Sequence, residues 1–168
     1  MSDRTSLRAY IEKSIRTSFS GVRLGDGISL RQAEVIDRYG EGCSDPEFED
    51  LKRSEIVDDW TQIPFEELER DNIAHLDDAG FRYYLPALML SLLDHYGPAS
   101  MRVIGTLYNL RWLEGVDLLS TEQNTSVAQF LIALPELVQV SSGDNKMINE
   151  ALEIYWGRFL PRDTQRGT

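Results

Sequence analysis

The sequence predicts a mainly α-helical protein: a single compact domain of about six to eight helices around a buried central helix, residues 79–96. Three observations lead to this prediction. Apolar residues recur at helical spacing along most of the 168-residue chain. Two Ser-x-x-Gln capping boxes, at Ser29 and Ser120, mark helix starts. The stretch 77–96 is apolar on nearly all sides, which is typical of a helix buried in a core.

The central helix begins at a pair of acids and contains a proline. Asp77 or Asp78 can cap it, because a carboxylate there accepts backbone N–H groups. Pro86 removes one backbone donor, so we expect either a kink at 82–86 or a break into two short helices. The apolar run 83–93 is shorter than the ~20 residues that a membrane span needs, which favours a core helix.

The remaining chain alternates helical patterns with turn signals. Asp45-Pro46-Glu47 indicates another helix start, 103–106 fits a strand as an alternative to a helix, and 141–144 reads as a loop. Pro135 is expected to end or kink its helix. Helices are predicted over 5–19, 29–40, 65–72, 99–112, 120–134 and 146–159. Residues 1–160 are expected to form one domain, and 161–168 a flexible tail.

The charge of the chain is unevenly distributed. The formal net charge is −11, and residues 34–78 alone carry sixteen Asp and Glu against four Arg and Lys, a balance of −12. Such a block disfavours phosphate backbones and favours a basic partner, so we expect no nucleic acid partner. The start of the chain has no signal-like apolar region and no segment suits a bilayer, so we expect a cytoplasmic protein without membrane contact.

No motif assigns a reaction. The glycines of 21–27 do not form GxGxxG or a phosphate loop, and no HExxH or GxSxG pattern occurs. The single cysteine, Cys43, excludes an intrachain disulfide and disfavours a cysteine metal site. The sequence therefore predicts no cofactor, no metal site and no catalytic residue, and it leaves enzymatic activity open.

The leading hypothesis is a protein–protein interaction module that binds a basic partner. A concrete version is an immunity-type or antitoxin-like protein that covers a basic toxin, with complementary charge giving fast capture. The candidate contacts are the acids of the charged block: Glu47, Glu49, Asp50, Asp58, Asp59, Glu66, Glu67 and Glu69.

Two alternatives remain open. One is an enzyme or small-ligand binder with a pocket near the start of the central helix, built from His75, Asp78, Arg82, Tyr83 and Tyr84. In that region the plainer interpretation of Arg82 is structural: its stem packs on aromatic rings and its head meets a carboxylate. The other is a homo-oligomeric structural subunit, since three Trp and seven Tyr offer interface anchors.

Four pieces of the sequence together resemble a known family. They are the stretch 21–28 (GVRLGDGI), the Asp59-Trp60 pair with Pro64, the stretch 80–87 (GFRYYLPA), and the segment from Gln123 to Trp156 containing Phe130-Leu131 and Tyr155-Trp156. This pattern, from about 18 to 156, resembles an uncharacterised family of bacterial proteins, described as a domain of unknown function. The resemblance implies a soluble bacterial domain and carries over no activity, cofactor or catalytic residue.

Overall fold

The computed structural model describes residues 3–40, 48–70 and 73–161. In these ranges the chain forms seven α-helices, four short 3₁₀-helices and no strand, which confirms the predicted helical class. The α-helices are α1 (Asp3–Ser18), α2 (Leu30–Tyr39), α3 (Phe48–Arg53), α4 (Asp78–His95), α5 (Met101–Trp112), α6 (Thr121–Leu137) and α7 (Ser142–Ile154). The 3₁₀-helices are η1 (Trp60–Gln62), η2 (Phe65–Glu69), η3 (Ile73–His75) and η4 (Trp156–Phe159).

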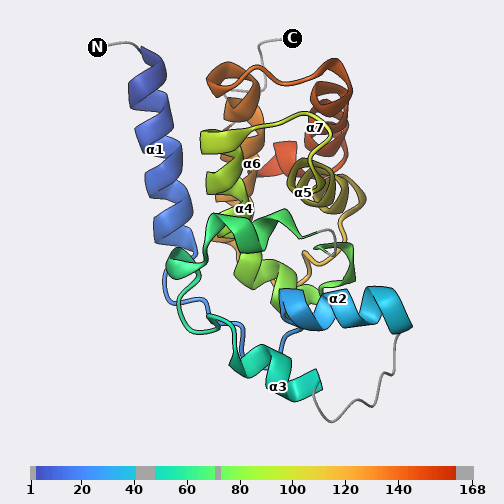
Figure 1. Ribbon diagram of the computed structural model, residues 1–168. Helices are drawn as coiled ribbons and strands as arrows, with labels where there is room; N and C mark the ends of the chain where they lie inside the picture. Colours follow the sequence, from blue (N-terminus) through green and yellow to red (C-terminus); the bar gives the residue numbers. More distant parts are fainter. Residues whose placement is uncertain (1–2, 41–47, 71–72, 162–168) are drawn as a thin grey trace.

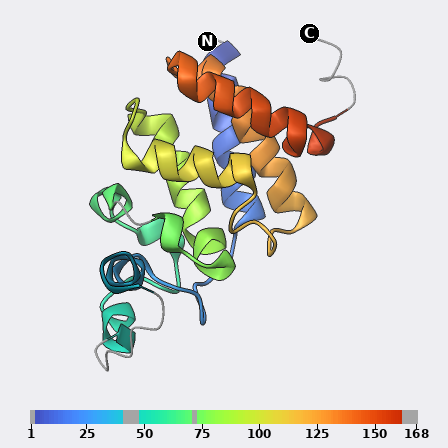
Figure 2. The ribbon, with the colours of Figure 1, turned by 90° about the vertical axis from the view of Figure 1, so that its right-hand side faces the viewer.

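Helix α4 lies at the centre, and two groups of elements pack around it (Figure 1). Helix α1 lies along α6, and α5 lies against α7; together with α4 and η4 these helices form the helical body. Helices α2 and α3 pack on each other at the end opposite to the start of α1 (Figures 1 and 2). We call α2, α3 and η1–η3 the lobe (residues 30–40, 48–70 and 73–75). The lobe contacts the body mainly through its 3₁₀-helices, which touch α4 and α5.

Helix α4 is buried on all sides, as its composition predicts. Twelve of its 18 residues are buried, and the aromatic rings of Phe81, Tyr83 and Tyr84 are almost completely inaccessible. The helix continues through Pro86 without interruption from Asp78 to His95, so the alternative of two short helices is wrong. Contacts with α1, α5, α6 and the lobe hold its backbone although Pro86 cannot donate a helical hydrogen bond.

The predicted helix starts are confirmed at three places. Ser29 with Gln32 forms a complete capping box at α2, and Ser120 with Gln123 forms another at α6. Of the two candidate acids, Asp77 caps α4: its carboxylate accepts from the Gly80 N–H. Local polar contacts therefore set these helix starts, as the sequence pattern indicates.

The second half of the chain is more helical than expected. Residues 141–144 are not a loop, because the Ser141 side chain accepts from the Asp144 N–H and caps α7. Helix α6 passes through Pro135 to Leu137, and α7 ends at Ile154 before η4. Residues 103–106 lie within α5, which excludes the strand alternative. The predicted helix 65–72 is instead the 3₁₀-helix η2, with its last two residues outside the described ranges.

Some predictions fall on residues that the structure does not describe. The helix start at 45–47 and residues 162–168 of the predicted tail lie outside the described ranges. Among the described helices, none combines the length and apolar character needed to cross a bilayer.

A close backbone contact joins the loop before α2 to the start of α4. A Cβ built on Gly27 would lie 2.7 Å from the Gly80 nitrogen, and one built on Gly80 would lie 2.4 Å from the Ile28 carbonyl oxygen. The same Oδ1 atom of Asp77 accepts from the Ile28 N–H and the Gly80 N–H, each at 2.8 Å. Two glycines and one carboxylate thus form a junction, which we call the Asp77 junction (Gly27, Ile28, Asp77 and Gly80).

The junction predicts an unfavourable glycine-to-alanine change inside a helix. Gly80→Ala should lower the free energy of unfolding by about 2 kcal/mol or more, because the new Cβ meets backbone that cannot move away. Gly143→Ala in α7 is the control: its Cβ meets no atom within 4 Å, so helix propensity should raise stability by up to about 1 kcal/mol. Urea unfolding measures both, and equal shifts for the two variants would contradict the close contact.

Candidate functional site

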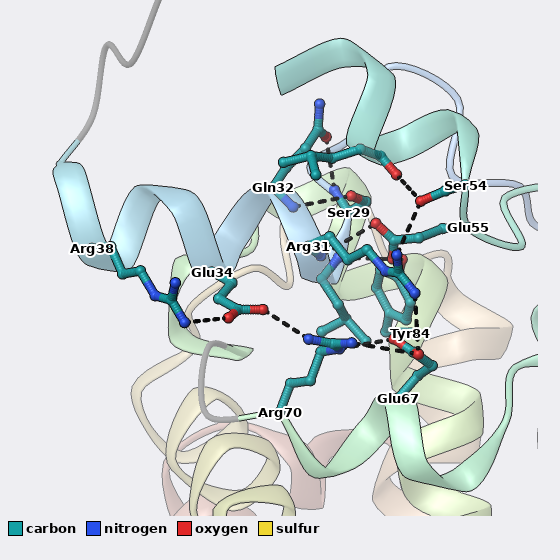
Figure 3. A network of polar contacts seen from close by, with 12 residues as sticks. Ser29, Arg31, Gln32, Glu34, Arg38, Ser54, Glu55, Glu67, Arg70 and Tyr84 are labelled. Atoms are coloured by element: carbon teal, nitrogen blue, oxygen red, sulfur yellow. Dashed lines mark hydrogen bonds and ion pairs between the residues drawn. The ribbon is translucent and has the colours of Figure 1, made fainter. Parts of the chain in front are cut away.

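A chain of alternating charges joins α2 to η2 across the lobe (Figure 3). Glu34 accepts from Arg38 and from Arg70, each at 2.7 Å. Arg70 Nε also donates to Glu67 at 2.8 Å, and Arg31 Nη2 lies 3.5 Å from the same carboxylate. The hydrogen bond from Arg70 lowers the pKa of Glu67, and Glu67 in turn raises the pKa of Arg70. The two therefore stay charged over the neutral pH range.

Tyr84 connects α4 to the lobe beside this chain. Its hydroxyl donates to Glu55 Oε2 at 3.2 Å and accepts from the Leu30 N–H at 3.4 Å. Burial, and then the negative charge of Glu55, raise the pKa of Tyr84 far above its usual range. Burial likewise raises the pKa of Tyr83, whose hydroxyl donates to the Ile56 carbonyl at 2.7 Å. Both side chains are neutral phenols at physiological pH, and both donate a hydrogen bond to the lobe.

A cavity of about 230 Å³ opens next to Tyr84. It lies between the start of α2, the segment after α3, the segment leading into η2, and α4. Four lining side chains are apolar and five are polar or charged: Leu30, Ile56, Ile63 and Pro64, with Arg31, Ser54, Glu55, Glu67 and Tyr84. This mixture of apolar walls and convergent polar groups is typical of a small-molecule site.

The five residues of the predicted pocket are not gathered in this cavity. Of the set, Tyr84 lines it, and Tyr83 is sealed in the core. His75 Nε2 lies 2.9 Å from Asp37 Oδ1 on α2, and Asp78 is in the first turn of α4. Arg82 Nε donates to Gln123 Oε1 at 3.2 Å, so its partner is a capping amide and not the expected carboxylate. The sequence interpretation missed the lobe's polar contributions to this cavity: Arg31, Ser54 and Glu55 were not singled out, and Glu67 was assigned to the acidic contact surface instead.

The structure divides the predicted acidic contacts into two kinds. Glu67 is held by Arg70 and Arg31, and Glu69 by Arg102, so these two carboxylates serve internal ion pairs. Glu69 is itself exposed on its outer side, and so are the others within the described residues: Glu49, Asp50, Asp58, Asp59 and Glu66. Asp50 and Asp58 form exposed pairs with Arg53 and Arg23, and Glu47 lies outside the described ranges.

Arg102 is a buried cation that the sequence interpretation did not single out. Its side chain is only 4% exposed and lies 2.9 Å from Glu69 Oε1, above the Phe65 ring at 4.2 Å. It also donates to the Ser91 hydroxyl and the His95 carbonyl, each at 3.1 Å. The sequence contains a pattern that could have indicated this burial. Arg102, Thr106 and Asn109 are polar residues spaced by four and three, so they share a face of α5 beside its apolar stripe.

The tryptophans bear on the oligomer alternative. Trp60 is buried and donates to the Phe19 carbonyl at 2.8 Å; Trp156 is buried and donates to the Leu110 carbonyl at 2.8 Å. Both are anchors within the chain, whereas Trp112 is 56% exposed at the end of α5. Of the three tryptophans, Trp112 alone is exposed enough to contribute to an oligomer interface.

A comparison with known protein families tests the family resemblance noted in the sequence. A model described as "Family of unknown function (DUF6714)" matches residues 7–160. The chain belongs to this family. The match extends beyond the predicted range of 18–156 at both ends and includes the Asp77 junction and the cavity. No curated protein and no solved structure shows significant similarity to the chain.

The Arg102 pair predicts unequal effects at two nearby acids. Glu69→Ala should lower the free energy of unfolding by about 1–2 kcal/mol, because it leaves the buried guanidinium without its carboxylate. Glu66→Ala, at an exposed acid of the same 3₁₀-helix, should change it by less than about 0.5 kcal/mol. Urea unfolding at neutral pH measures both, and similar values for the two variants would contradict a structural role of the pair.

Proposed function

We propose that the chain is a protein-binding module whose lobe docks a basic partner protein. The supporting observation is the charge of the lobe. Residues 30–75 carry fourteen Asp and Glu against five Arg and Lys, a balance of −9. Counting only the described residues of this range, ten acids and five bases give a formal charge balance of −5. Arg23 and Arg102 lie outside the lobe and pair with its acids; including them changes the balance to −3.

The proposed contact set consists of the exposed acids that form no buried ion pair within the chain. One of them, Asp59, also caps η1 by accepting from the Thr61 N–H, a bond that asparagine at this position can keep. Glu49, Asp59 and Glu66 are exposed and lack a cationic partner among the described residues; Asp50 and Asp58 are exposed in surface pairs. Surface ion pairs contribute little, so a partner's Lys or Arg can replace Arg53 or Arg23. Glu67 and Glu69 belong to the internal structure and are not part of the proposed contact.

The finer version of the proposal is an immunity-type or antitoxin-like protein of the bacterial cytoplasm. Such a protein has to capture a basic toxin before the toxin reaches its target, and opposite charge raises association rates most at low salt. A lobe that projects from a closely packed helical body fits this task because it presents charge without exposing the core. The partner expected is therefore basic, and it should leave the complex as salt rises.

A matched pair of triple variants tests the proposal. In Glu49→Gln/Asp59→Asn/Glu66→Gln, the association rate of the salt-sensitive partner recovered from the native cell should fall by about tenfold or more at low salt. Its salt dependence should become flatter. The control, Glu114→Gln/Glu136→Gln/Glu153→Gln, removes the same charge from exposed positions of the helical body and should keep the wild-type rate. Equal rates for both triples, or capture that resists high salt, would refute docking through the lobe.

A further inference from the structure

We propose that the cavity beside Tyr84 binds a small zwitterion of the α-amino acid class, with its ammonium on Glu55 and its carboxylate on Arg31. The inference does not rest on the docking proposal, because it concerns a concave site between the lobe and α4 and not the exposed acids. Its basis is a pair of opposite charges on the wall of one cavity, both incompletely satisfied.

Glu55 is the anionic side of the site. Its two oxygens are held by neutral donors: the Arg31 backbone N–H binds Oε1, and the Tyr84 hydroxyl binds Oε2, each at 3.2 Å. Among the described residues, no Lys, Arg or His side chain forms an ion pair with this carboxylate. The group is thus fixed in position yet keeps its charge uncompensated, which suits an incoming ammonium group.

Arg31 is the cationic side. Its Nη1 donates to the Ser54 hydroxyl at 3.2 Å, and its Nη2 lies 3.5 Å from Glu67, a carboxylate that Arg70 already holds at 2.8 Å. Its Nε is buried and has no acceptor within the part of the chain that the structure describes, so the donors left for a ligand are the second N–H groups of Nη1 and Nη2. A guanidinium has five N–H donors, so Arg31 retains capacity for a ligand carboxylate (Figure 3).

The apolar walls and the volume limit the size of the ligand. Leu30, Ile63 and Pro64, with Ile56 at the exposed edge, can cover a short aliphatic side chain. At about 30 Å³ for each water, 230 Å³ corresponds to about seven or eight waters, hence a ligand of similar heavy-atom count. That is smaller than a drug-sized molecule and matches a small aliphatic amino acid such as valine.

The charges disfavour simpler ions. A plain anion would meet the negative lobe, with Glu55 and Glu67 on the cavity wall. A plain cation would satisfy Glu55 but would leave Arg31 facing a like charge. A zwitterion places each of its charges against the opposite sign, so it should bind better than either of its halves.

The first experiment compares ligands on the unmodified protein. Amide chemical shifts are followed while glycine, L-alanine, L-valine or L-leucine is added up to about 20 mM, a range that detects millimolar binding. Valine should give saturable shifts at residues lining the cavity. Isobutylamine and 3-methylbutanoate, which are valine without its carboxylate or its ammonium, should each bind at least about tenfold more weakly.

Variants locate the two charges. Arg31→Gln and Glu55→Gln should each weaken valine binding at least about tenfold, while the controls Arg53→Gln and Glu49→Gln, both on α3 outside the cavity lining, should keep wild-type affinity. The proposal is overturned if no amino acid of the four gives saturable shifts at the cavity, or if isobutylamine binds as tightly as valine. The ligand comparison uses the unmodified protein, so it tests zwitterion binding even if a variant fails to fold.

Discussion

One carboxylate oxygen holds the two parts of this molecule in register. Asp77 Oδ1 accepts the N–H of Gly80, in the first turn of α4, and the N–H of Ile28, which precedes α2. The contact is possible because neither Gly27 nor Gly80 has a Cβ, so the two backbones approach directly. Since Ser29 caps α2 one residue later, the Asp77 junction fixes where the lobe begins relative to the central helix.

The candidate site depends on this register. Tyr84 lies one turn beyond Gly80 on α4, and its hydroxyl reaches both the Leu30 N–H and Glu55. The cavity exists because the start of α2 is held beside that hydroxyl, and the alternating charges from Arg38 to Arg31 keep α2 against η2. A rigid buried helix thus supports a polar surface built mainly by the lobe, which separates the residues that fold the protein from those proposed to bind.

The local features were predictable, and the long-range ones were not. Capping boxes at Ser29 and Ser120 and the apolar periodicity of α4 depend on neighbours in sequence, so they gave correct helix starts and a correct buried helix. The cavity brings Arg31, Glu55, Glu67 and Tyr84 together from four segments, and no spacing in the sequence encodes that meeting. At Pro86 a break and at Pro135 a helix end were the wrong alternatives, because tertiary packing holds both helices despite the missing donors.

Hydrogen exchange on an Asp77→Ala variant tests most directly whether the junction positions the lobe. Without the carboxylate, exchange should accelerate in residues 24–40 as well as in the first turn of α4, while α5, α6 and α7 keep wild-type protection. Asp78→Ala, which removes the neighbouring carboxylate, should leave residues 24–40 unchanged. If exchange in the Asp77 variant accelerates only at the start of α4, Asp77 is a helix cap and nothing more, and the lobe must be held in place by other contacts.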